Sequence, residues 1–80
     1  MSSMYTNVFG NIVSMKEIRF AQNLKQLRES SQLTQKQLGA LINVDQRTVS
    51  AWEKGICEPS YSILARLCEI FHETFDSILT

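Results

Sequence analysis

The residues best suited to chemistry lie in the short stretch "DQRTVSAWEKG", residues 45–55. If this stretch is a helix, Val49 and Trp52 share its apolar face. The outer face is then short and mostly polar, with one cation and no bulky apolar group: Gln46, Arg47, Ser50 and Ala51. An amide donates and accepts hydrogen bonds, and a guanidinium donates several. This face is therefore suited to binding a partner that offers hydrogen-bonding groups. Two interpretations are open, a helix that enters a DNA groove or the solvated face of a small bundle.

The chain has little of the chemistry of an enzyme. His72 is the single histidine, Cys57 and Cys68 stand at no recognisable ligand spacing, and no glycine-rich phosphate loop is present. We expect His72 as a cap or surface residue, Cys68 in the core and Cys57 in a loop, both as reduced thiols. The sequence therefore predicts no enzyme activity, no catalytic residue, no metal and no cofactor.

The charges are unevenly distributed along a chain whose formal net charge is zero. Residues 16–54 carry seven cations against four acids, and residues 55–80 carry one cation against four acids. A zero net charge argues against indiscriminate binding of polyanions. The basic half, however, contains the 45–55 stretch.

The chain of 80 residues is long enough for one domain, which we expect over residues 16–80. No apolar run is long enough to span a membrane, and the first residues lack the cations and cleavage site of a secretory signal, so a cytoplasmic location is expected. Residues 1–15 are uncharged and alternate weakly. They indicate a flexible tail, or a short extended arm that packs on a partner subunit.

Apolar residues at helical spacing predict five helices with short connections and no convincing strand, an all-α fold. The expected helices cover 16 to about 30, 35–42, 46–53, 61–71 and a short segment after residue 74. Side chains that cap helix N-termini stand before the last four: Thr34, Asp45, Ser60 and Thr74. Asn43 and Gly55 suit sharp helix ends, and Pro59 bars continuation.

The two central helices meet the specification of a helix-turn-helix. Each has about eight residues, and "NV" joins them in a tight turn. Gly39 is the small residue where they cross. The apolar residues expected to lock one helix onto the other are Leu38, Ile42, Val44, Val49 and Trp52.

The stretch "LTQKQLGALINVDQRTVSAWEKGICEPSYSILARLCEIF" resembles the phage-repressor and Cro type of helix-turn-helix domain, also called the xenobiotic-response-element family. The "TQ", "TVS", "WE", glycine and "PS" elements all fall at the spacing of that family, and the resemblance covers residues 17–79. It implies a compact five-helix, lambda-repressor-like DNA-binding domain. Gly39 stands where the family usually has Ala and Asn43 where it has Gly, and both differences are expected to be sterically conservative.

The resemblance implies that the helix at 46–53 lies in the major groove of double-stranded DNA. The implied base-reading residues are Gln46, Arg47, Thr48, Ser50 and Ala51. The implied phosphate contacts are Thr34, Gln35, Lys36 and Lys54. A Gln amide suits adenine, an Arg fork suits guanine and an Ala methyl suits thymine. The family also implies a structural ion pair between Arg28 and Glu53.

Two functions from different classes remain open at this point. One is a transcriptional regulator, most simply a repressor that binds a palindromic operator as a homodimer; phage repressor, restriction controller and antitoxin subtypes are not distinguished. The other is a protein-interaction module, such as an antitoxin-like partner-binding protein, with weak or no DNA binding. Candidates for a dimer surface are Ile63, Phe75, Ile78, Leu79 and the segment "NVFGNIV", although Phe75 and Ile78 are equally suited to the monomer core.

Overall fold

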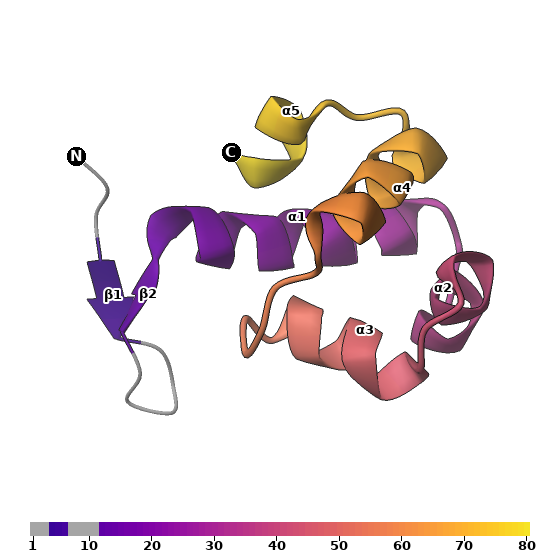
Figure 1. Cartoon of the computed structure of the whole chain (residues 1–80), viewed down its shortest axis with the longest axis horizontal. Coiled ribbons are helices and arrows are strands. Elements are labelled where there is room, and N and C mark those ends of the chain that lie inside the picture. The colour runs from indigo at the N-terminus through magenta and orange to yellow at the C-terminus, as the bar shows by residue number, and fades with distance from the viewer. Residues whose placement is uncertain (1–3, 7–11) are drawn as a thin grey trace.

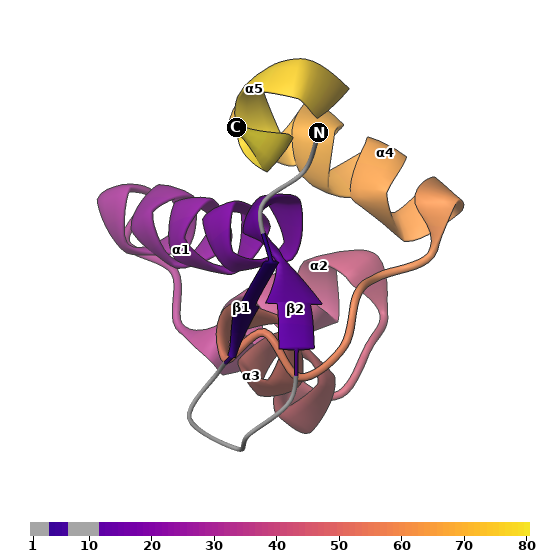
Figure 2. The same ribbon diagram turned by 90° about the vertical axis from the view of Figure 1, so that its left-hand side faces the viewer.

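Five helices and a short hairpin make up the described part of the chain, residues 4–6 and 12–80 of this computed structural model. The elements in chain order are β1 (Met4–Thr6), β2 (Ile12–Ser14), α1 (Met15–Ser30), α2 (Gln35–Ile42), α3 (Gln46–Glu53), α4 (Tyr61–Phe71) and α5 (Phe75–Leu79). The helix α1 crosses the middle of the molecule, with α3 on one side of it and α5 on the other (Figures 1 and 2). The predicted all-α fold with five helices is confirmed.

The hairpin at the start of the chain was not predicted from the sequence. β1 and β2 pair antiparallel, with Met4 opposite Ser14 and Thr6 opposite Ile12. Figure 2 shows this ribbon in front of the helices, leading directly into α1. Strands of three residues are too short for alternation to be a clear signal, because strands are usually recognised over four to eight residues. The expected domain boundary at residue 16 stays a prediction.

The helix ends follow the signals in the sequence. The side chains of Thr34, Asp45, Ser60 and Thr74 each accept a backbone N–H of the helix that follows. Asn43 ends α2 in the left-handed conformation with φ 59°, and Gly55 follows α3 with φ 73°. His72 ends α4 in the same left-handed conformation and is exposed, as expected of a cap residue. These local signals therefore fix where α2, α3, α4 and α5 begin.

One core packs all five helices together. Its buried members are Phe20, Leu24, Leu38, Ile42, Val49, Trp52, Leu64, Leu67, Cys68, Phe71 and Ile78. The predicted core positions of Trp52 and Cys68 are confirmed, and Cys57 lies in the loop between α3 and α4, as expected, where it is exposed. In the described part of the chain, no helix combines the length and apolar character required to cross a membrane.

The turn between α2 and α3 depends on the missing side chain of Gly39. The N–H of Val44 donates to Gly39 O over 2.9 Å, so the chain folds back closely over this residue. A Cβ atom at Gly39 would lie 2.6 Å from Val44 O, which is backbone and cannot rotate away. The expectation that Gly39 in place of the usual Ala is sterically conservative is therefore wrong, because the backbone passes closer than a methyl group allows.

Candidate nucleic-acid interface

An ion pair between α1 and α3 fixes the C-terminal end of α3. Arg28 Nε donates to Glu53 Oε2 over 2.7 Å, and a second guanidinium nitrogen donates to Glu53 Oε1 over 3.0 Å. The Arg28 and Glu53 side chains are 11% and 4% exposed. Arg28 also donates to Leu33 O over 2.8 Å. The hydrogen bond with Glu53 raises the pKa of Arg28 above its already high ordinary value, so the guanidinium stays charged at any working pH.

Glu53 also holds the first residue of α2. The side-chain amide of Gln35 donates to Glu53 Oε1 over 3.2 Å, so one carboxylate connects α1, α2 and α3. Gln35 is half-buried as a result. Its expected role as a phosphate contact stays a prediction, and the structure adds a positioning partner that the sequence did not indicate.

The two faces of α3 differ as the sequence predicts. Val49 and Trp52 are buried at 0% and 2% exposure and hold the helix against the core. On the outer side Gln46 and Arg47 are exposed, while Ser50 and Ala51 are half-buried. The helix therefore presents its N-terminal residues to solvent and its C-terminal end to the ion pair.

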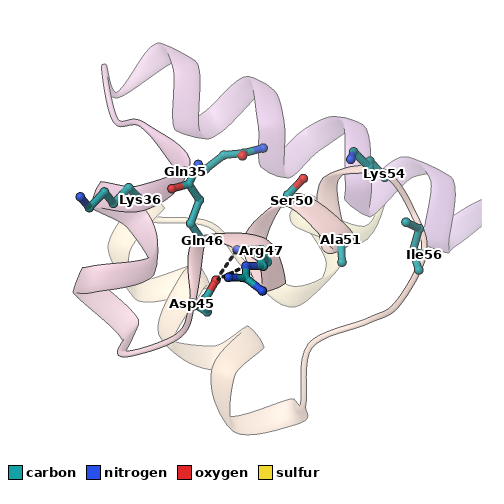
Figure 3. A pocket seen from close by; sticks show the side chains of 9 residues that line it. All are labelled: Gln35, Lys36, Asp45, Gln46, Arg47, Ser50, Ala51, Lys54 and Ile56. Atoms are coloured by element: carbon teal, nitrogen blue, oxygen red, sulfur yellow. Dashed lines mark hydrogen bonds and ion pairs between the residues drawn. The ribbon is translucent and has the colours of Figure 1, made fainter.

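An open hollow of about 670 Å³ lies over the outer face of α3 and the start of α2. Its lining residues, drawn in Figure 3, are Gln35, Lys36, Asp45, Gln46, Arg47, Ser50, Ala51, Lys54 and Ile56. Lys36 lies at one end of this row, and Lys54 and Ile56 lie at the other end. The structure thus brings together seven of the nine residues for which the sequence implied DNA contacts.

The two other implied DNA contacts lie outside the hollow. Thr34 is exposed, and its hydroxyl accepts the N–H of Gln37 over 3.0 Å as the cap of α2. Its own N–H donates to Gln37 Oε1 over 2.8 Å, which completes a reciprocal capping box. Thr48 is half-buried in the first turn of α3. Both assignments stay predictions.

Two residues of the hollow were not among the sequence-implied contacts. Ile56 follows the left-handed Gly55 and is 56% exposed, an unusual position for a large apolar side chain. Asp45 was recognised only as a helix cap, yet its side chain also lines the hollow. The one sequence signal that could have indicated this was the place of Asp45 directly before Gln46, an implied base-reading residue.

The hollow is suited to an extended anion with hydrogen-bonding groups. Lys36, Arg47 and Lys54 are exposed cations along it, and the amide of Gln46 supplies donors and an acceptor. The first turns of α2 and α3 add backbone N–H groups and the positive ends of two helix dipoles. Phosphates and base edges together offer the matching acceptors.

Comparison with known proteins agrees with this geometry. A family model described as helix-turn-helix matches residues 24–78. The chain belongs to the helix-turn-helix family. The membership indicated by the "TQ" and "WE" elements, that of the phage-repressor and Cro type, is thereby confirmed. The match includes α2, α3 and the whole hollow.

Three relatives show how this domain occurs in other proteins. The HTH-type transcriptional activator BcrR of Enterococcus faecalis is 33% identical over 63 residues, which are 79% of this chain and 31% of BcrR. The solution structure of the SOS-response transcriptional repressor LexA from Eubacterium rectale is 25% identical with a TM-score of 0.76, covering 81% of this chain and 69% of that one. Hydroxypropylphosphonic acid epoxidase from S. wedmorenis is 26% identical with a TM-score of 0.73, covering 80% of this chain and 34% of the epoxidase. The chain therefore spans about a third of BcrR and of the epoxidase.

Proposed function

We propose that the protein is a transcriptional regulator that binds double-stranded DNA at a specific sequence, with α3 in the major groove. The observation that carries the proposal is the hollow of the helix-turn-helix, where three cations and the exposed amide of Gln46 face solvent together. BcrR and LexA, both similar to this chain, are named as transcriptional regulators. The match to the epoxidase covers a third of that enzyme and carries no activity over to this chain.

In this proposal the DNA contacts divide into residues that read bases and residues that bind phosphates. Gln46, Arg47 and Ser50 reach base edges, and Ala51 and Thr48 lie closer to the helix axis as smaller contacts. Lys36 and Lys54 bind phosphates on the two sides of the groove, since they lie at opposite ends of the row (Figure 3). The remaining phosphate contacts, by Gln35 and Thr34, come from the start of α2.

We propose that two copies act together on a palindromic operator. A single domain with a few phosphate contacts binds weakly, because non-specific affinities are typically about 10⁻⁴ to 10⁻⁶ M at physiological salt. A two-fold dimer doubles the contacts and spaces two recognition helices by about 34 Å, one turn of DNA.

The candidate dimer surface is smaller than the sequence indicated. Ile78 is fully buried in the core and is removed from the set. Ile63, Phe75 and Leu79 are half-buried, and the Tyr61 ring, 78% exposed, packs on Phe75 with centroids 5.0 Å apart. The segment "NVFGNIV" lies largely outside the described residues. Tyr61, which the sequence did not indicate, therefore joins Phe75 as a candidate on the side of α4 and α5.

We propose repression as the outcome of binding. A domain that covers a promoter lowers transcription by occupancy alone, whereas activation requires a further surface for the transcription machinery. Transcription in vitro from a promoter that contains the selected operator checks this directly: added protein should lower the transcript level, and an increase would assign activation instead.

Selection of bound fragments from a genomic or random DNA library tests the DNA-binding function. We expect an enriched palindromic sequence and salt-sensitive binding. Arg47→Ala should lose about 1–3 kcal/mol of affinity and relax the preference at one base position in each half-site. Arg19→Ala is the matched control, since Arg19 is exposed on α1 and lies outside the hollow. An unenriched library and no salt-dependent retention on random DNA would instead favour the protein-interaction module.

A further inference from the structure

The hollow contains an acid that a surface for a polyanion does not require. Asp45 is the one carboxylate among the described residues that line the hollow, next to three cations. Its side chain accepts the N–H of Arg47 over 2.7 Å and so caps α3. Asn and Ser cap helices about as well as Asp, so capping alone does not require the negative charge. The charge is favourable at the positive end of the α3 dipole, and it also acts on the cations beside it.

The same carboxylate oxygen lies near the guanidinium that is proposed to read a base. Asp45 Oδ1 is 3.9 Å from Arg47 Nε, and the two side chains are 65% and 96% exposed. Figure 3 shows the Arg47 side chain folded back toward Asp45 at the start of α3. An exposed pair at this distance is weak and opens readily. Arg47 is therefore held near Asp45 but remains available to a stronger acceptor.

We propose that Asp45 determines specificity by penalising contacts between Arg47 and DNA phosphates. This inference rests on the proposed function. A phosphate that binds Arg47 brings a negative charge close to Asp45, and like charges at that range repel. The guanine edge offers two acceptors, O6 and N7, without a net charge, so the same acid hardly opposes it. Asp45 thus weakens binding to DNA in general more than binding to the site that offers guanine to Arg47.

The effect is a matter of discrimination between competitors. A protein that selects one sequence has to reject a large excess of other sequences, all of which present the same phosphates. A repulsive group raises specificity when it acts more strongly on the wrong partner than on the right one. Asp45 meets this condition because it repels the phosphate charge, which every DNA sequence presents. It hardly affects the uncharged guanine edge, which only some sequences present to Arg47.

Asp45→Asn is the variant that isolates the charge. The carboxamide retains an oxygen that can cap α3, so the fold and the position of Arg47 N–H are preserved. The matched control is Asp76→Asn, which changes the net charge equally on α5, at the other side of the molecule from α3 (Figures 1 and 2). Thermal unfolding of both variants verifies that each is folded at the temperature of the binding assay.

The affinities of the three proteins are measured for the selected operator and for random DNA of the same length, over a series of salt concentrations. For Asp45→Asn we expect affinity for random DNA to rise about two- to fivefold at low salt, with a smaller change at the operator. The ratio of the two affinities falls accordingly. The difference shrinks as salt increases, and Asp76→Asn leaves the ratio unchanged.

Three results would overturn the proposal. The two affinities of Asp45→Asn could change by the same factor, or Asp76→Asn could alter the ratio equally, which would make the effect one of net charge. A loss confined to the operator would make Asp45 itself a base reader, since a carboxylate accepts from cytosine N4. A wild-type protein that enriches no sequence contradicts the proposed function instead, so the two failures are distinguishable.

Discussion

Glu53 is a charged side chain that the fold removes almost completely from water, with 4% of it exposed. Burial of a carboxylate is unfavourable unless it is paired and hydrogen-bonded. Here Arg28 donates to both oxygens and Gln35 adds a third hydrogen bond. These hydrogen bonds therefore offset the cost of burying the carboxylate, and they fix the position of the C-terminal end of α3 relative to α1 and α2.

Glu53→Gln should be strongly destabilising because it removes the negative charge beside the buried guanidinium of Arg28 and replaces one of the two acceptor oxygens with an NH2 donor. Loss of one partner of a buried pair typically costs about 3–5 kcal/mol, and we expect the lower end because Leu33 O still accepts from Arg28. Urea unfolding followed by Trp52 fluorescence measures the loss. Glu69→Gln on the exposed face of α4 is the control and should change the free energy of unfolding by less than about 0.5 kcal/mol. Equal effects of the two substitutions would contradict the structural role.

Cys68 should make the stability of the protein fall at alkaline pH. Burial raises the pKa of its thiol above the ordinary 9.0, and Glu73 raises it further. The folded state then holds the proton more tightly than the unfolded state, so this contribution is complete below pH 9.0 and is lost as pH rises through the folded pKa. The free-energy difference between wild type and Cys68→Ala should be larger at pH 7 than at pH 10.

A buried side chain without an ionisable group provides the control for this pH effect. Ile78→Val should differ from wild type by the same amount at both pH values, because neither isoleucine nor valine titrates. A Cys68→Ala difference that does not change with pH would contradict the assigned cause.

At the scale of elements, the crossing of α2 and α3 is the most constrained part of the fold. Asn43 ends α2 in the left-handed conformation, and Val44 N–H returns to Gly39 O within the same turn. Arg66 on α4 supports this end of α2, because its guanidinium donates to Leu41 O over 3.0 Å. The direction of α3 is therefore set by backbone contacts at one end and by Glu53 at the other.

Gly39→Ala tests this crossing through the sign of its effect. Helix propensity alone predicts stabilisation by about 1 kcal/mol, since Gly is unfavourable inside a helix. The added Cβ would meet Val44 O at 2.6 Å, and overpacking of this kind costs about 1–3 kcal/mol. We expect net destabilisation together with weaker operator binding, because the turn must open and α3 must tilt. Increased thermal stability with unchanged binding would contradict the close contact.

The sequence predicted the helices well because their signals are local. Caps such as Thr34 and Ser60 act on N–H groups two or three residues away, and apolar spacing acts within a turn or two. The features that it missed depend on how separate segments of the chain meet. The hydrogen bond from Gln35 to Glu53 joins residues 18 positions apart. The close approach of Val44 O to Gly39 depends on how the turn between α2 and α3 closes. The role of Arg28 was accessible only through the family resemblance.

The candidate site was predicted as a set of residues rather than as a surface. Helical spacing places Gln46, Arg47 and Ser50 on one face, which is a local property of α3. That Ile56 and Asp45 line the same hollow depends on how the chain enters and leaves α3. Spacing within one helix contains no information about its flanking loops.

At the scale of the whole molecule, cations on the side of α3 and acids on the side of α5 are separated by α1. The exposed cations of the hollow lie on one side of α1, and Glu69 and Asp76 belong to α4 and α5 on the other side (Figure 1). Because the net charge is zero, DNA does not attract the protein strongly at long range. The separation of positive and negative charge instead orients the protein with its cations toward the DNA. Binding should therefore be modest for one copy and sensitive to salt.

The salt dependence of binding can count how many copies occupy the operator. Each phosphate contact contributes about −0.9 to the slope of log affinity against log salt concentration. Lys54→Ala removes one such contact per copy, so the slope should become shallower by about 0.9 for a monomer and by about 1.8 for a dimer. We expect the larger change, with little effect on which sequence is preferred, because Lys54 is proposed to bind phosphate and not a base. Lys25→Ala on α1, outside the hollow, is the matched control and should leave the slope unchanged. Sedimentation equilibrium of the complex gives the stoichiometry independently, and one copy per operator together with a change near 0.9 would contradict the proposed dimer.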